Sequence, residues 1–164
     1  MEPLTRSAIQ RGLVNVTKSE RAALTTPADF EATDWAALDF FGWRDPKFPH
    51  RGYLVRQRDQ ALLAVAVATT GGGRPGRKAM CDICRAVDNS DAVALFTARR
   101  VGAAGRNGNT VGTYLCAGLD CSAQLRRPRN RIGRTRPDGG RDVEVVAAEM
   151  VRRLDSFLDT VRAE

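Results

Sequence analysis

The feature that most constrains this chain of 164 residues is its set of four cysteines. Cys81 and Cys84 form one close pair, and Cys116 and Cys121 form a second pair about thirty residues later. Two thiolates on a tight turn can point at one ion, and a second pair brought back by a hairpin completes a tetrahedron. The spacing therefore predicts one structural zinc ion, because four thiolates suit a tetrahedral ion without redox chemistry.

Other uses of four cysteines stay open at this point. An iron–sulfur cluster also takes four thiolates, and spacing alone does not separate it from zinc. Two disulfides require an oxidising compartment, which nothing in the sequence indicates. A redox Cys-x-x-C pair normally starts a helix after a strand, and it would leave the second pair unexplained.

The segment between the two pairs predicts a hairpin. Residues 92–100 have the apolar content of a strand, residues 101–110 are rich in glycine and asparagine, and residues 111–115 form the returning strand. A short helix is expected to begin after Cys121. A cysteine turn, a hairpin, and ligands at a helix start follow the order of a treble-clef zinc finger.

The remainder predicts an α+β fold with short N-terminal helices, a β-hairpin and a long C-terminal helix. Thr5 is positioned to cap a helix over residues 5–14, and Thr17 with Glu20 matches a capping box. Residues 53–55 and 62–68 are expected to pair as strands. Asp142 is expected to cap an amphipathic helix that ends near residue 162. Residues 1–70 and 71–164 are thus predicted as an N-terminal α/β region and a finger region within one compact unit.

Residues 30–53 hold both tryptophans and most of the aromatic side chains. Because aromatic side chains supply large buried areas, Trp35 and Trp43 are predicted to lie in the core rather than to form a stacking surface for bases. Asp34 is expected to cap a helical turn over residues 35–40, and residues 42–46 are expected to form a loop.

The charge is concentrated around the cysteines. Residues 71–141 carry 14 Lys and Arg against 5 Asp and Glu, a net +9, whereas the rest carries 12 against 14, a net −2. An excess of this kind predicts an acidic partner, either nucleic acid or an acidic protein face. A solvated arginine-rich surface is the alternative explanation.

The sequence predicts a cytoplasmic protein that is not an enzyme. Its longest apolar run is too short to cross a bilayer, and its start lacks the layout of a signal peptide. His50 is the sole histidine, so no Ser/His/Asp arrangement is expected beyond that single imidazole. A four-cysteine site also leaves no coordination position for an activated water molecule.

Three motifs together resemble the FBP-type treble-clef proteins, which are relatives of the FusB-type proteins that bind elongation factor G. These motifs are Asp-Phe-Phe-Gly-Trp-Arg-Asp-Pro at residues 39–46, Met-Cys-Asp-Ile-Cys at residues 80–84, and the segment at residues 105–121. The resemblance implies a zinc finger that binds elongation factor G and helps it to leave the ribosome. FusB-type members thereby protect translation from fusidic acid, but the N-terminal region of this chain is shorter than theirs.

The resemblance also indicates where a partner is expected to bind. Met80 and Tyr114 match family positions on the partner surface, whereas the lysine that FusB-type hairpins carry before this tyrosine is replaced by Val-Gly-Thr. Basic side chains around the finger complete the predicted partner surface, namely Arg99, Arg100, Arg106, Arg126 and Arg127. Only one of the adjacent Arg99 and Arg100 can point toward a given face of a strand. The alternative function is an RNA- or ribosome-binding zinc finger.

Overall fold

The computed structural model describes residues 1–58, 61–69, 79–88, 93–126 and 141–163. Its centre is an antiparallel five-stranded sheet with the order β1-β2-β3-β6-β7. The strands of this sheet are β1 (Phe41–Arg44), β2 (Arg51–Arg58), β3 (Ala61–Ala68), β6 (Val93–Arg99) and β7 (Thr110–Cys116). A separate two-stranded ribbon consists of β4 (Ala79–Met80) and β5 (Val87–Asp88).

The two predicted hairpins are present, and a strand pairing joins them into one sheet. β2 pairs with β3, and β6 pairs with β7 from Val93 opposite Cys116 to Arg99 opposite Thr110. β3 also pairs with β6, where Ala68 lies opposite Thr97. The N-terminal hairpin and the finger hairpin therefore share a hydrogen-bonded sheet that crosses the boundary at residue 70.

β1 is a strand where the sequence predicted a loop. Phe41 and Trp43 alternate with partly exposed neighbours, which is the period of a strand. Gly42 suggested a break, but the structure needs a glycine there for close packing. A Cβ atom at this position would lie 2.3 Å from the carbonyl oxygen of Leu119.

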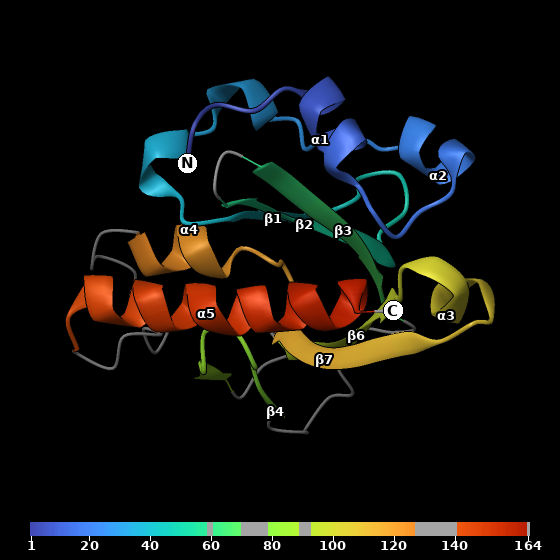
Figure 1. Cartoon of the computed structure of the whole chain (residues 1–164). Helices are drawn as coiled ribbons and strands as arrows, with labels where there is room; N and C mark the ends of the chain where they lie inside the picture. Colours follow the sequence, from blue (N-terminus) through green and yellow to red (C-terminus); the bar gives the residue numbers. More distant parts are fainter. Residues whose placement is uncertain (59–60, 70–78, 89–92, 127–140, 164) are drawn as a thin grey trace.

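One face of the sheet is covered by the N-terminal layer (Figure 1). This layer consists of α1 (Arg6–Gly12), α2 (Lys18–Ala22), η1 (Phe30–Ala32) and η2 (Trp35–Ala37). The Thr5 hydroxyl accepts a hydrogen bond from the Ala8 N–H, and Thr17 with Glu20 forms the predicted capping box. The Asp34 prediction was wrong, because its side chain caps nothing and the turn that follows is a short 3-10 helix.

The aromatic side chains form the core beneath the N-terminal layer. Trp35 and Trp43 are buried, as predicted. The ring of Phe41 stacks on Trp43 with centroids 4.9 Å apart, and Trp43 lies equally close to Tyr53. The Trp43 indole N–H donates to the Thr25 carbonyl at 2.9 Å, so this polar group is satisfied although the ring is buried.

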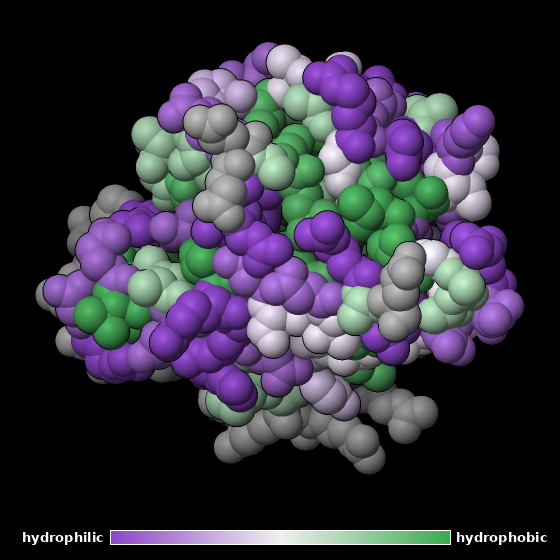
Figure 2. All heavy atoms as spheres, in the orientation of Figure 1, coloured by the Kyte–Doolittle hydropathy of each residue, from purple (hydrophilic) through white to green (hydrophobic). Residues whose placement is uncertain are grey.

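The second layer contains α4 (Cys121–Arg126) and α5 (Val143–Arg162), which lie on the other side of the sheet from the N-terminal helices (Figure 1). Asp142 caps α5 as predicted, because its carboxylate accepts hydrogen bonds from the Glu144 and Val145 N–H groups. In the view of Figure 2, polar side chains cover much of α5, and apolar side chains reach the surface between α5 and the N-terminal layer.

The connection between β6 and β7 is more ordered than predicted. It contains a short helix, α3 (Gly102–Arg106), within the segment that the sequence indicated as an irregular loop. Its first residue, Gly102, has φ 74°, a conformation that favours glycine. Within the part of the chain that the structure describes, no helix has the combination of length and apolar character that is needed to cross a membrane.

Candidate metal centre

The four cysteines converge from three separate elements onto one buried point. Cys81 and Cys84 lie on the turn between β4 and β5, Cys116 is the last residue of β7, and Cys121 is the first residue of α4. All four side chains are buried, and their Sγ atoms lie within 4.8 Å of one another. The topology is the one predicted for a treble clef.

The sulfur positions fit a single tetrahedral ion. Cys81 Sγ and Cys121 Sγ are 3.8 Å apart, and Cys84 Sγ and Cys116 Sγ are 3.5 Å apart. Four sulfurs at about 2.3 Å from a central zinc ion would lie about 3.8 Å from one another in a regular tetrahedron. These separations are too long for disulfide bonds, in which the sulfurs are about 2.05 Å apart.

Each cysteine turn is closed by a backbone hydrogen bond to the carbonyl of its first cysteine. The Arg85 N–H donates to the Cys81 carbonyl at 2.9 Å, and the Leu119 N–H donates to the Cys116 carbonyl at 2.8 Å. Arg85 and Leu119 both take left-handed conformations, with φ 61° and 59°. Each turn thereby curls around the site, so that its cysteines point at the same ion.

The pKa shifts of the cysteine thiols favour the binding of a cation. Hydrogen bonds from the Cys116, Cys121 and Cys84 thiols lower the pKa of Cys81, because they stabilise its thiolate. The pKa of Cys121 is raised, first by its hydrogen bond with Cys116 and further by burial. The buried site thus stabilises one thiolate but disfavours deprotonation of all four cysteines. A divalent ion would neutralise the negative charges and so favour the four thiolates.

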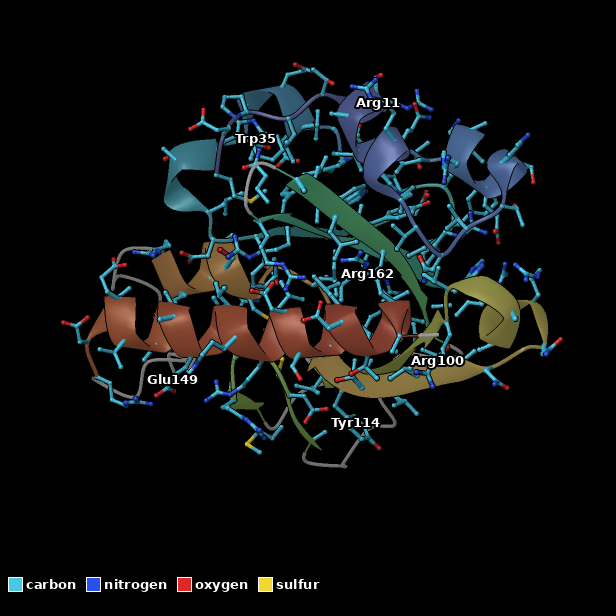
Figure 3. All side chains as sticks on the ribbon, in the orientation of Figure 1. Arg11, Trp35, Arg100, Tyr114, Glu149 and Arg162 are labelled. Atoms are coloured by element: carbon cyan, nitrogen blue, oxygen red, sulfur yellow. The ribbon has the colours of Figure 1, made fainter. Side chains whose placement is uncertain are left out.

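Neighbouring elements support the first cysteine turn. Arg153 of α5 donates to the Ile83 carbonyl at 3.1 Å and forms an ion pair with Glu149 at 3.0 Å. A hydrogen bond from Arg141 lowers the pKa of Glu149 to about 2, so this carboxylate is charged at neutral pH. In Figure 3, Glu149 projects from α5 on the side of β4.

Asp82, between the first two cysteines, clamps the turn onto β7. Its N–H donates to the Tyr114 carbonyl at 2.8 Å, and its carboxylate accepts from the Tyr114 N–H at 2.8 Å and from the Thr113 hydroxyl at 3.0 Å. This role of Asp82 was not predicted from the sequence. Its position inside the Cys-x-x-C turn was the only signal in the sequence.

The predicted partner residues do not all lie on one surface. Tyr114 and Met80 are exposed on neighbouring strands beside the metal centre, and Tyr114 points away from α5 in Figure 3. Arg99 is exposed on the same face of the sheet as Tyr114, because it lies four positions after Leu95 on β6, and Leu95 lies opposite Tyr114. Arg106 is exposed on α3.

Two of the predicted arginines are placed differently. Arg100 follows β6 and is only partly exposed, with its Nε atom buried. Arg126 pairs with Asp39 at 2.9 Å and with Glu144, so it ties α4 to the start of β1 and to α5 instead of joining Tyr114. These two carboxylates explain its inward position, and their hydrogen bonds raise the pKa of Arg126. Arg127 lies outside the described residues.

Comparison with known proteins identifies one family. A family model described as "FBP C-terminal treble-clef zinc-finger" matches residues 8–161. No curated protein and no solved structure matches the chain. The matched description and the sulfur geometry agree, so the four cysteines form the site of one structural zinc ion.

Proposed function

Because this chain belongs to the FBP C-terminal treble-clef zinc-finger family, we propose that it is a binding protein for translation elongation factor G. The partner follows from the resemblance to FusB-type proteins, and promotion of the factor's release from the ribosome is part of the same proposal. The observation that supports it is a set of three exposed apolar side chains, Met80, Leu95 and Tyr114, on β4, β6 and β7; we call this set the apolar cluster.

Two members of the apolar cluster lie side by side on the sheet. Leu95 and Tyr114 are 48% and 46% exposed, although they lie directly opposite each other on β6 and β7. Met80 is 41% exposed on β4, two residues before the Asp82 clamp on Tyr114. Large apolar and aromatic side chains at the centre of a contact supply most of the binding energy in protein interfaces.

Charged groups lie at the border of the apolar cluster. Arg99 is 46% exposed on the same sheet face, and its guanidinium lies 3.5 Å from the Glu20 carboxylate. Arg106 is exposed on α3, and no ion pair of its side chain is found among the described residues. An acidic protein surface is therefore the complementary partner, with apolar contact at its centre and carboxylates at its rim.

The proposed role is binding without catalysis. Four thiolates complete the coordination of zinc and leave no position for a reacting water molecule. His50 is exposed in the connection between β1 and β2, where its ring lies 6.3 Å from that of Phe48. Among the described residues, no side chain hydrogen-bonds to this imidazole, as the orienting partner of a general base would.

The test is the binding of purified, zinc-loaded protein to elongation factor G from the same organism. We expect Tyr114→Ala to weaken binding about fivefold to thirtyfold, because truncation of a central aromatic costs roughly 1–2 kcal/mol. One zinc ion per chain should remain, since Tyr114 is not a ligand. Phe48→Ala is the matched control, because Phe48 is 41% exposed but lies between β1 and β2.

Equal effects of the two substitutions would contradict the proposed surface. The RNA-binding alternative gives a different result, in which wild type does not bind the factor but binds RNA with an affinity that falls steeply with salt. Such a slope reports counterion release from phosphates, which an apolar protein contact does not produce to the same degree.

A further inference from the structure

β1 forms the edge of the sheet opposite β7, and some of its backbone groups are unpaired within the sheet. The Asp45 N–H donates to the Arg51 carbonyl at 2.9 Å, and Trp43 and Phe41 lie opposite β2 two and four residues earlier. Because hydrogen-bonding direction alternates along an antiparallel strand, the N–H and C=O groups of Gly42 and Arg44 point away from β2. They have no backbone partner among the described residues.

This edge forms the floor of a groove with a volume of about 630 Å³. One wall belongs to the N-terminal layer and includes Pro27 and Leu38. The opposite wall includes Gly118 of the second cysteine turn and Ala123 of α4. The two layers that cover the sheet thus extend past β1 and leave a groove along its outer edge.

Two carboxylates border the groove on its N-terminal wall. Asp29 and Asp34 are both exposed there, and neither forms an ion pair among the described residues. The two arginines that border the groove are engaged elsewhere. Arg44 lies over the Phe96 ring and donates to the Ala117 carbonyl at 3.2 Å, and Arg126 is paired with Asp39 and Glu144.

We propose that this groove binds an extended peptide segment that carries Lys or Arg and adds a strand to β1. The outward groups of Gly42 and Arg44 would supply the main-chain hydrogen bonds, and the apolar walls would receive alternate side chains. The acidic border selects basic side chains over acidic ones. This activity is separate from the proposed function, because β1 and β7 lie at opposite edges of the sheet.

The experiment selects peptides from a random octapeptide phage library on the immobilised, zinc-loaded full chain. We expect the recovered peptides to contain Lys or Arg, and a synthetic copy to shift the amide resonances of Gly42 and Arg44. N-methylation of alternate peptide residues should abolish binding for one of the two possible patterns, because that pattern removes the backbone N–H groups that pair with β1.

Two matched protein variants test the acidic border. The double variant Asp29→Lys/Asp34→Lys should weaken the selected peptide at least tenfold. Glu2→Lys/Glu31→Lys has the same change in net charge at exposed positions outside the groove, and its affinity should stay within twofold of wild type.

Four results would overturn the proposal. The first three are a library that yields no binder, selected peptides that shift the Tyr114 amide rather than those of Gly42 and Arg44, and N-methylation that leaves binding unchanged. A fourth contrary outcome is dimerisation that grows with protein concentration and shifts the same two amides, since a second copy of the chain would then occupy the edge. None of these results depends on binding of elongation factor G.

Discussion

Asp45 holds three segments of the aromatic region together. Its carboxylate, 1% exposed, accepts hydrogen bonds from the Thr25 hydroxyl, from the Lys47 N–H at 2.9 Å and from the Tyr53 hydroxyl at 3.1 Å. Burial alone would raise the pKa of Asp45, but these hydrogen bonds outweigh it and the pKa lies below its usual range. A charged acceptor is therefore built into the core at neutral pH.

Removal of this charge should destabilise the fold. We expect Asp45→Asn to lower the free energy of unfolding by about 1–3 kcal/mol at pH 7, because buried donors would lose a charged acceptor. A double-mutant cycle with Tyr53→Phe, read by urea unfolding, should give a coupling energy of roughly 0.5–3 kcal/mol. Strict additivity of the two changes would show that the Tyr53 hydrogen bond contributes nothing.

Single residues show what the sequence could and could not predict. The cysteine positions, the Thr17 capping box and the burial of both tryptophans were predicted, because local spacing and side-chain size determine them. The inward ion pairs of Arg126 were not predicted. They depend on Asp39, 87 residues away, and on the packing of three elements that no local pattern specifies.

The first cysteine turn acts on its neighbouring strand through Asp82. This residue carries two of the hydrogen bonds of Tyr114, and it lies between two zinc ligands. The position of the exposed tyrosine is therefore coupled to the turn that the metal organises. Coordination of zinc and orientation of the apolar cluster are linked through this one side chain and its backbone.

Asp82→Ala should loosen β7 without loss of the metal. We expect the Tyr114 amide to exchange with solvent on the order of tenfold faster, which corresponds to about 1.4 kcal/mol for a hydrogen bond to a charged group. Zinc content should stay at one ion per chain. The Asp82→Asn variant keeps a neutral acceptor, so its Tyr114 amide should exchange at a rate between those of wild type and Asp82→Ala. An unchanged exchange rate in Asp82→Ala would refute the clamp.

Two elements were missed for related reasons. β1 was predicted as a loop because Gly42 lies within this four-residue segment and Pro46 follows it, and its strand character depends on pairing with β2. α3 was hidden in a segment rich in glycine and asparagine. The long helix α5 was predicted closely, since its apolar period continues over 20 residues and Asp142 marks its start.

The whole molecule is organised around one sheet rather than around two neighbouring units. The pairing of β3 with β6 connects the aromatic core to the core around the cysteines, α4 and α5. This pairing is short, and both strands had been assigned to separate hairpins. A long-range contact of this kind leaves no trace in local sequence patterns, so it was not predicted.

Loss of zinc should therefore destabilise the aromatic core on the other side of the sheet. We expect Cys116→Ser to bind less than one zinc ion per chain and to lower the unfolding midpoint measured by tryptophan fluorescence, since Trp35 and Trp43 lie in the other core. Circular dichroism should report the same single transition. A tryptophan transition that keeps its wild-type midpoint would show instead that the two halves unfold independently.

The Asp82 clamp has a further consequence for the apo-protein. β7 ends the sheet, and the alternation fixed by the hydrogen bond from the Arg100 N–H to the Asn109 carbonyl places the backbone groups of Gly112 and Tyr114 on its outer side. If the cysteine turn detaches, these groups become a template for intermolecular β-pairing beside the apolar Leu95 and Tyr114 side chains. Zinc starvation would then lead to aggregation, so the metal also protects the chain against insolubility.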